Sequence, residues 1–198
     1  MSVTIITPTY NRNSNILKRC FASVDTQTYY NWNHLVLVDD ETVEKHIPNE
    51  VSEMFRMNRE FICMGKRTNN YGNSPRQLGI EKGLGDYFVF LDDDNVIFPN
   101  YLETMVKYLE QNVEKQMAIC KIIHMGPLPA KFGDPPKVLS GNPPVLQNID
   151  TLQVCVRKDV VKTFGWLDKG YLADGYTIEY WGQNCKYGFV DEILGVHL

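Results

Sequence analysis

Short, continuous runs of apolar and β-branched residues alternate with segments of helical periodicity, and this alternation constrains the fold more than any other feature of the chain. The runs lie at 3–7, 34–40, 61–64, 86–94 and 117–125. Runs without a polar face are typical of strands covered on both sides, as in the parallel sheets of α/β proteins. The sequence therefore predicts an α/β fold with a mostly parallel central sheet flanked by helices.

Helical segments fill the intervals between these runs. One starts near Asn13 or Ser14, either of which is a suitable N-cap. A short helix is expected over 74–85, and Pro99 is expected at the first position of the next helix. Beyond the fifth run the expected elements are a strand with a short helix within 152–168, a helix over 177–188 and a strand over 189–196.

Size and charge narrow the classes of function. The 198 residues are enough for one domain, and the net charge of −4 gives no strong attraction to nucleic acid. No apolar run approaches the length that crosses a bilayer, and the first residues lack a signal-peptide pattern. Five scattered cysteines without CxxC spacing indicate reduced thiols, so we expect a cytoplasmic protein. The strand-like last residues are typical of a domain cut from a longer protein, whose N-terminal part this chain would form.

Polar residues follow three of the predicted strands: the turn-like PTYNR after the first, Asp39 after the second, and Asp92 to Asp94 after the fourth. In open α/β sheets, ligands bind at the carboxyl ends of the strands. Alternation along a strand would place Asp92 and Asp94 on one side and Asp93 on the other. Two acids on one side suit Mg²⁺ or Mn²⁺, which prefer oxygen ligands and often share their coordination shell with substrate phosphates.

Each of these motifs alone has an ordinary explanation, because acidic residues often end strands and PTYNR fits a simple turn. Two other nucleotide-related classes fit less well. The segment after the first strand contains no glycine, unlike the phosphate loop of a nucleotidylyltransferase. That strand also ends in Thr7 and Pro8 rather than in the aspartate nucleophile of a phosphoryl-transfer domain.

Taken together and in chain order, the segments resemble the inverting glycosyltransferases of family 2, which have the GT-A fold. VTIITPTYNR is similar to the family's opening strand and P-x-Y-N turn, and NWNHLVLVDDET to its second strand with V-D-D. SPRQLGIEKGLGDYFVFLDDDNVIFP resembles the family's block that runs from R-N-x-G-I to L-D-x-D-D-x-x-x-P. Gln77 stands in place of the asparagine of R-N, and Asn95 in place of the last acidic residue. VCVRKDVVKTFGWLDKGYLAD leads to the family's E-D motif, which reads Ala173-Asp174 here.

The resemblance implies a sugar donor activated by a nucleoside diphosphate, UDP first among the candidates, and a glycan or other hydroxyl acceptor. Residues 1–100 would form the nucleotide-binding half and 101–198 the acceptor-binding half. Tyr10 would lie against the uracil and Asp39 would accept its N3–H. Arg76 would reach the ribose or diphosphate, and Asp93 would hold the ribose. Arg12 is equally well explained as a phosphate contact or a solvated side chain. The donor-binding assignments are Pro8, Thr9, Tyr10, Arg12, Asp39, Arg76, Asp92 and Asp93.

The resemblance also implies a metal site and a general base. Asp94, with Asp92, would hold Mn²⁺ or Mg²⁺ on the diphosphate. Asp174 would take the proton of the attacking hydroxyl in a direct displacement, although ADGY is also an ordinary turn sequence. The missing glutamate before Asp174 keeps one alternative open: a catalytically degenerate GT-A-like module that binds nucleotide or glycan.

The remaining candidate residues are histidines and aromatic residues. His197 is either an additional metal ligand or an exposed terminal histidine. The sequence around His34, His46 and His124 suggests no site. A proline-rich segment, 125–150, is expected to form an aromatic-walled acceptor groove with four further residues. Trp166 and Trp181 could equally be core residues, and for Trp181 the core is the better explanation. The four are Trp166, Tyr171, Tyr176 and Trp181.

Overall fold

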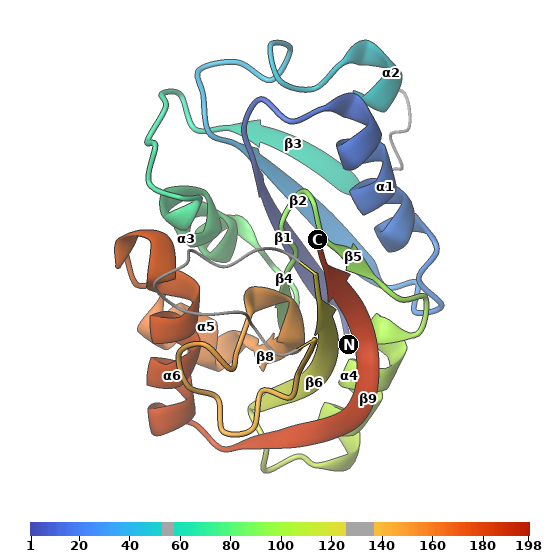
Figure 1. Cartoon of the computed structure of the whole chain (residues 1–198), viewed down its shortest axis with the longest axis vertical. Coiled ribbons are helices and arrows are strands. Elements are labelled where there is room, and N and C mark those ends of the chain that lie inside the picture. Colours follow the sequence, from blue (N-terminus) through green and yellow to red (C-terminus); the bar gives the residue numbers. More distant parts are fainter. Residues whose placement is uncertain (53–57, 126–136) are drawn as a thin grey trace.

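The computed structural model describes residues 1–52, 58–125 and 137–198, which fold into one sheet with helices on both faces (Figure 1). The sheet has the strand order β3-β2-β1-β4-β8-β6-β9-β5, and β7 pairs with β6. The strands are β1 (Val3–Thr9), β2 (Trp32–Val38), β3 (Arg59–Cys63), β4 (Tyr87–Phe90), β5 (Val96–Ile97), β6 (Met117–His124), β7 (Val138–Leu139), β8 (Val154–Arg157) and β9 (Tyr187–His197). The helices are α1 (Ser14–Asp25), α2 (Asn49–Ser52), α3 (Asn73–Lys82), α4 (Tyr101–Gln111), α5 (Lys158–Phe164) and α6 (Ala173–Asn184), with short 3₁₀ helices η2 (Thr151–Gln153) and η3 (Gly170–Leu172).

The sheet is mixed, because its two halves are built differently. Strands β3, β2, β1 and β4 are parallel, as the sequence predicted. Strand β8 is antiparallel to both β4 and β6, and β9 is parallel to β6. The expectation of a mostly parallel sheet therefore holds only for the first half. Because a single antiparallel strand separates β4 from β6, the carboxyl ends of β1, β2, β4, β6 and β9 all lie at one edge of the sheet.

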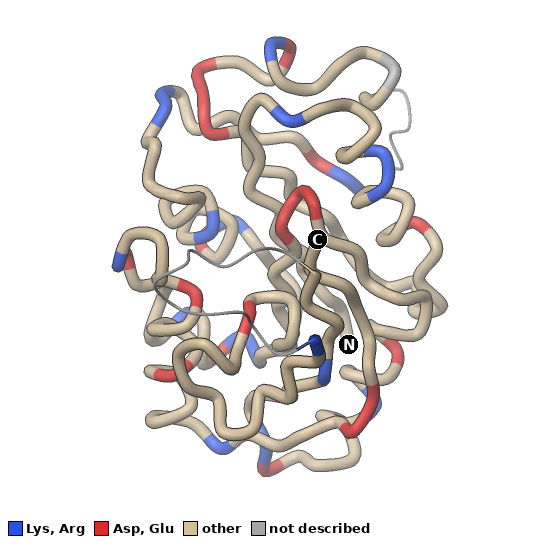
Figure 2. The backbone as a smooth tube through the Cα atoms, in the orientation of Figure 1, with Lys and Arg blue, Asp and Glu red and all other residues tan. Residues whose placement is uncertain are grey.

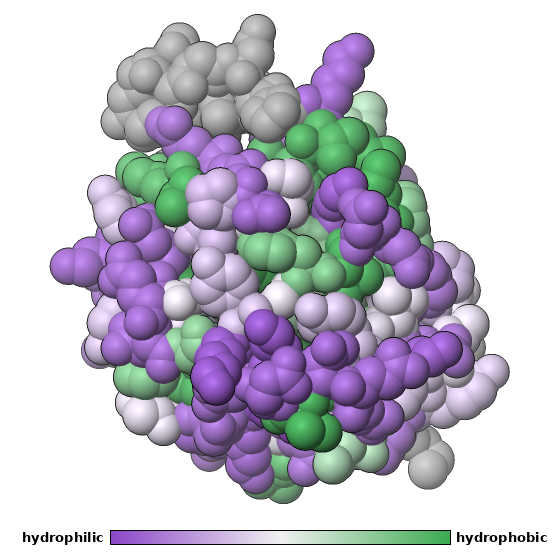
Figure 3. Space-filling model, turned by 90° about the horizontal axis from the view of Figure 1, so that it is seen from below, coloured by the Kyte–Doolittle hydropathy of each residue, from purple (hydrophilic) through white to green (hydrophobic). Residues whose placement is uncertain are grey.

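The sheet is covered on both faces, which explains the continuous apolar runs. Alternate residues of the first strand enter two separate cores: Val3 and Ile5 pack into one, Ile6 into the other. The first core lies under α1 and α4, whose apolar faces include Phe21 and Leu102. The second core includes apolar residues of α3, α5 and α6 and contains the buried Trp166 and Trp181. On the face shown in Figure 3, hydrophilic side chains cover most of the surface.

Among the element boundaries that differ from the sequence predictions, three bear on the site. The helix expected to begin at Pro99 begins at Tyr101, after the N-cap Asn100. Strand β4 ends at Phe90, so the three aspartates follow the strand rather than extend it. The last helix begins at Ala173 rather than Thr177, which places Asp174 in its first turn. Among the described residues, we find no helix that is both long and apolar enough to span a membrane.

Candidate active site

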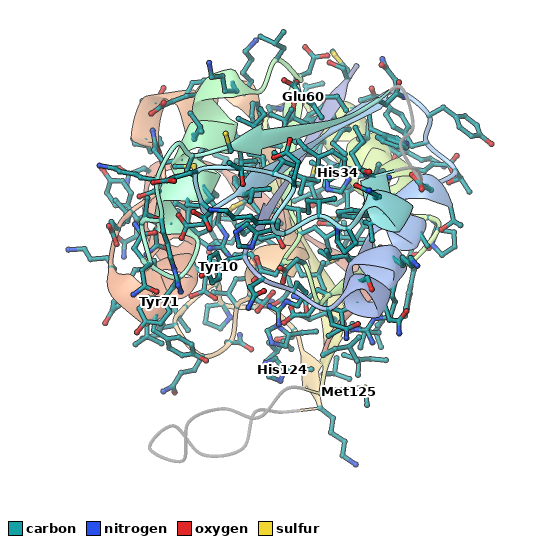
Figure 4. All side chains as sticks on the ribbon, turned by 90° about the horizontal axis from the view of Figure 1, so that it is seen from above. Tyr10, His34, Glu60, Tyr71, His124 and Met125 are labelled. Atoms are coloured by element: carbon teal, nitrogen blue, oxygen red, sulfur yellow. The ribbon has the colours of Figure 1, made fainter. Side chains whose placement is uncertain are left out.

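A pocket of about 410 Å³ opens at the edge of the sheet where β1, β2, β4, β6 and β9 have their carboxyl ends. It is lined by every residue that the sequence assigned to the donor, the metal and the base, and by His197. These residues are Pro8, Thr9, Tyr10, Arg12, Asp39, Arg76, Asp92, Asp93, Asp94, Asp174 and His197. Figure 4 labels three lining residues from separate segments: Tyr10 after β1, Tyr71 before α3 and His124 at the end of β6.

The three aspartates form a tight turn. The backbone N–H of Asn95 donates to the carbonyl oxygen of Asp92 over 3.0 Å, so the side chains do not alternate as they would along a strand. Asp93 is the most buried, with 5% of its side chain exposed, against 27% for Asp92 and 31% for Asp94. Figure 2 shows this acidic turn beside the C-terminus, where the N–H of Leu198 donates to the Asn95 side chain.

Asp93 is held by the first strand and the segment after it. Its carboxylate accepts a hydrogen bond from Thr9 Oγ1 over 2.7 Å and one from Arg12 Nε over 2.8 Å. A second guanidinium nitrogen of Arg12, Nη2, lies 2.6 Å from Asp93 and 3.1 Å from Asp94. Burial raises the pKa of Asp93, against the opposing effect of Arg12 and Thr9. Arg12 is therefore the cation that bridges two of the three acids.

Arg76, from α3, pairs with the third acid. One of its terminal nitrogens donates to Asp92, and the other donates to the carbonyl oxygen of Tyr71 over 2.9 Å. Its Nε is buried and has no hydrogen-bond partner among the described residues, although the side chain lines the pocket. A buried donor without a partner is costly. The guanidinium nonetheless places its positive charge at the pocket wall, beside Asp92.

The acidic turn offers a divalent cation two carboxylates, Asp92 and Asp94, but not a complete set of protein ligands. Burial raises the pKa of Asp94, and the charge of nearby Asp92 raises it further, so a cation between these two carboxylates would relieve their repulsion. Within the described residues, no three His, Cys, Asp or Glu side chains are arranged to hold a metal ion. Magnesium-type ions at nucleotide sites commonly take one or two carboxylates and complete their shell with phosphates and water. Asp92 and Asp94 fit that pattern.

The carboxylate of Asp39 is already engaged with the loop that precedes α3. It accepts hydrogen bonds from the backbone N–H and hydroxyl of Thr68, each over 2.7 Å, and from the N–H of Asn69 over 3.0 Å. This loop has left-handed backbone at Asn69, Tyr71 and Gly72. Asp39 thus fixes the loop at the pocket, and a base in the pocket would have to share this carboxylate with it.

Tyr10 is contacted by two basic side chains. The ring centroid of His46 lies 4.8 Å from that of Tyr10, and the guanidinium carbon of Arg67 lies 3.7 Å from it. His46 Nδ1 accepts the backbone N–H of Asn11, so its Nε2 carries the proton that is donated to Asp40. The sequence suggested no site at His46, yet His46 packs against the predicted base-stacking residue.

Asp174 lies in the first turn of α6 and lines the pocket. Burial raises its pKa to about 6, and the negative charge of Asp150 adds to this effect. The backbone N–H of Gly175 and the positive charge of Arg76 oppose it. A carboxylate whose pKa lies just below neutral pH is ionised at pH 7 and still basic enough to accept a proton.

His197 forms part of a cluster that the sequence did not reveal. Its Nδ1 lies 2.9 Å from the buried carboxylate of Asp150, and its ring stacks on that of His124 with centroids 4.3 Å apart. Burial opposes protonation of His197, but the hydrogen bond to Asp150 and its charge outweigh burial and raise the pKa to about 9. Burial lowers the pKa of His124, which also lines the pocket. His124 and His197 each end a strand, and that was the signal that could have found them.

The acceptor side differs from the predicted groove. Trp166 and Trp181 are buried core residues, in contact with the ring of Phe90, so neither can form a groove wall. Tyr171 and Tyr176 are exposed, and Tyr171 lines the pocket. Residues 126–136 of the proline-rich segment lie outside the described residues, while Leu139, Leu146, Gln147, Ile149 and Asp150 from its remainder line the pocket.

The sequence matches a known family over residues 4–131, described as Glycosyl transferase family 2. The chain belongs to this family. One relative, an uncharacterized glycosyltransferase of Rickettsia bellii (strain RML369-C), is 34% identical over 112 residues, which are 56% of this chain and 15% of the relative. The chain spans less than half of the length of the curated relatives that it matches here.

Solved structures share the fold over nearly the whole chain. S. aureus TarS 1-349, in complex with UDP-GlcNAc, has a TM-score of 0.77 at 15% identity and covers 99% of this chain, which covers 58% of TarS 1-349. The mannosyltransferase PcManGT from Pyrobaculum calidifontis, in complex with GDP-Man and Mn²⁺, has a TM-score of 0.74 at 14% identity. The match covers 98% of this chain and 56% of PcManGT. The GT-A fold that the resemblance implied is confirmed.

Proposed function

We propose that the family 2 domain is an inverting glycosyltransferase, which moves a sugar from a nucleoside-diphosphate donor, UDP by first choice, to a hydroxyl of a glycan or similar acceptor. One observation carries this proposal. Asp174, with a pKa of about 6, lines the same pocket as the acidic turn and the two arginines that hold it. The fold neighbours were solved with UDP-GlcNAc and with GDP-Man and so do not select a nucleoside; UDP is our choice because the resemblance assigns Tyr10 and Asp39 to a uracil.

On the donor side, arginines would contact the diphosphate directly, and aspartates would contact it through a divalent cation. Arg76 places its positive charge at the pocket beside Asp92, and Arg12 places positive charge between Asp93 and Asp94. Asp92 and Asp94 would hold Mg²⁺ or Mn²⁺, which supplies positive charge to a leaving diphosphate when it is bound. The resemblance assigned Asp93 to the ribose, but its side chain is only 5% exposed and is bound by Thr9 and Arg12. Asp93 would instead orient Arg12, which would contact the phosphate.

On the acceptor side, Asp174 would act as the general base. In the displacement, a hydroxyl oxygen of the acceptor forms a bond to the anomeric carbon as the bond from that carbon to the diphosphate oxygen breaks. The hydroxyl proton passes to the Asp174 carboxylate, and the configuration of the anomeric carbon inverts. A well-placed general base contributes about 10²–10⁴-fold in rate. Residues 1–100 would then bind the nucleotide and 101–198 the acceptor. His197, held by Asp150, lies near enough to the acidic turn for Asp92 and Asp94 to raise its pKa.

The test is donor hydrolysis, in which water takes the place of the acceptor. The protein is incubated with Mn²⁺ and UDP-GlcNAc, UDP-glucose, UDP-galactose or GDP-mannose, and the released nucleoside diphosphate is measured. We expect release from at least one UDP-sugar, with a steep loss in Asp174→Asn. Binding of a nucleotide without any release would favour the alternative, a degenerate module, for which Ala173 in place of the family's glutamate is the supporting observation.

A further inference from the structure

Two exposed tyrosines from segments far apart in the sequence meet at the pocket. Tyr71, in the loop before α3, has 66% of its surface exposed, and Tyr171, in η3, has 53%. Their ring centroids lie 5.7 Å apart at an interplanar angle of 80°, and both residues line the pocket. Two large rings held against each other in water leave apolar faces available to a ligand.

Tyr71 has a backbone conformation that is unfavourable for a tyrosine. Its φ is +60°, in the left-handed region that bulky side chains rarely adopt. Its carbonyl oxygen accepts a hydrogen bond from Arg76 Nη1 over 2.9 Å, so the strained residue is tied to the arginine that holds the acidic turn. Residues in sparsely populated backbone regions cluster at active sites and ligand clamps, where the surrounding structure enforces them.

Tyr171 is fixed on the side of the base. It lies three residues before Asp174, and the preceding carbonyl oxygen, that of Gly170, accepts a hydrogen bond from the Asn73 side chain over 3.1 Å. The same amide nitrogen donates to Asp168 over 3.0 Å. Asn73 is the first residue of α3, two positions after Tyr71. The two tyrosines are therefore held in register by one buried asparagine, and they are not two independent surface residues.

We propose that Tyr71 and Tyr171 form an acceptor subsite that binds a saccharide ring, so that the acceptor of this enzyme is a carbohydrate. This inference rests on the proposed function and names its acceptor class. The C–H faces of a pyranose carry slight positive charge and pack on the negative faces of aromatic rings. Tyrosine suits such contacts because it offers a rigid ring with few torsions to immobilise, and a hydroxyl for polar contacts.

The test measures saccharide binding by saturation-transfer NMR. The UDP-loaded protein is mixed with methyl β-glucoside, methyl β-galactoside, methyl α-mannoside and methyl N-acetyl-β-glucosaminide, which stand in for the unknown acceptor. Tyr71→Gly removes the ring and suits the left-handed backbone, whereas Tyr71→Phe keeps the ring. Tyr30→Ala is the matched control, because Tyr30 is the more exposed residue and is not in the pocket lining.

We expect at least one glycoside to bind wild type, Tyr71→Phe and Tyr30→Ala alike, and to bind Tyr71→Gly at least tenfold more weakly. The Tm of Tyr71→Gly should not fall below that of wild type, which excludes loss of fold as the cause. Equal binding to Tyr71→Gly, or no binding of any glycoside to wild type, would overturn the proposal. UDP binding of wild type, followed separately, shows whether the proposed function itself fails: glycoside binding without UDP binding would contradict the transferase and keep the saccharide subsite.

Discussion

Replacing Asp174 by asparagine should change activity and stability in opposite directions. The ordinary pKa of an aspartate is 3.8, and burial in the pocket raises that of Asp174 to about 6. A shift of one pKa unit corresponds to 1.36 kcal/mol, so the ionised carboxylate lowers the free energy of unfolding by at most about 3 kcal/mol. Asparagine has the same shape without the charge, and its oxygen can still accept the N–H of Gly175 that Asp174 accepts.

The effect has a defined pH dependence. Well below pH 3.8 the Asp174 carboxyl is protonated in both the folded and the unfolded chain, so it does not change the free energy of unfolding. As the pH rises towards 6, the unfolded chain ionises first, and wild type loses stability that Asp174→Asn keeps. The difference in free energy of unfolding should therefore grow between about pH 4 and pH 6 and stay constant above. It corresponds to a Tm difference of about 6–12 °C for a chain of this size.

The assay is urea unfolding of both proteins at several pH values between 3.5 and 8. Donor hydrolysis and transfer, measured on the same samples, should fall about 10²–10⁴-fold in the variant. In wild type, activity should rise with pH through about 6, as the base loses its proton. Asp159→Asn is the matched control, because Asp159 is an exposed aspartate in the first turn of α5. A stability difference that does not change with pH would refute the burial of the Asp174 charge, and near-normal transfer would refute its role as base.

Two further predictions concern the arginine at the acidic turn and the strand pair that positions this turn. Arg76→Lys cannot reproduce the contacts to Asp92, the Tyr71 carbonyl and a phosphate together, so UDP should bind about 10–100-fold more weakly by calorimetry; equal affinity would contradict the phosphate contact. Gly85→Ala would place a Cβ 2.6 Å from the backbone nitrogen of Thr4 and should lower the free energy of unfolding by about 1–3 kcal/mol. Gly182→Ala, inside α6 with its nearest neighbour at 3.4 Å, should instead raise it by up to about 1 kcal/mol, and the same sign for both variants would show that packing is not the cause.

The sequence was most informative where a residue's position follows from the strand that precedes it. Asp39 and the acidic turn follow buried strands that are parallel, so their meeting at one edge of the sheet followed from the sequence. Arg12 and Arg76 were assigned from the resemblance, and the structure places both on the acidic turn. The amino-acid composition of a strand does not indicate its direction in the sheet. For this reason the sequence did not predict that β8 is antiparallel.

The remaining differences come from contacts between distant segments. The separation of His124 and His197 in sequence hides their stacking, which depends on the pairing of β6 with β9. Tyr71 was not noticed because nothing in the sequence indicates its left-handed backbone or its contact with Tyr171. The alternation expected for the three aspartates failed because their chain turns back immediately after β4, with Asn95 closing the turn.

The most direct test of the central claim is the thermal shift of the protein with UDP, CDP, ADP and GDP, each with and without Mn²⁺. A ligand at 100 times its Kd stabilises a protein by about 2.7 kcal/mol, or about 5–11 °C in Tm for a chain of this size. The account predicts a shift of this order for UDP that requires Mn²⁺ and is lost in Asp94→Asn. The absence of a shift with every nucleotide, with Mn²⁺ present, would contradict a nucleotide-diphosphate site at the acidic turn.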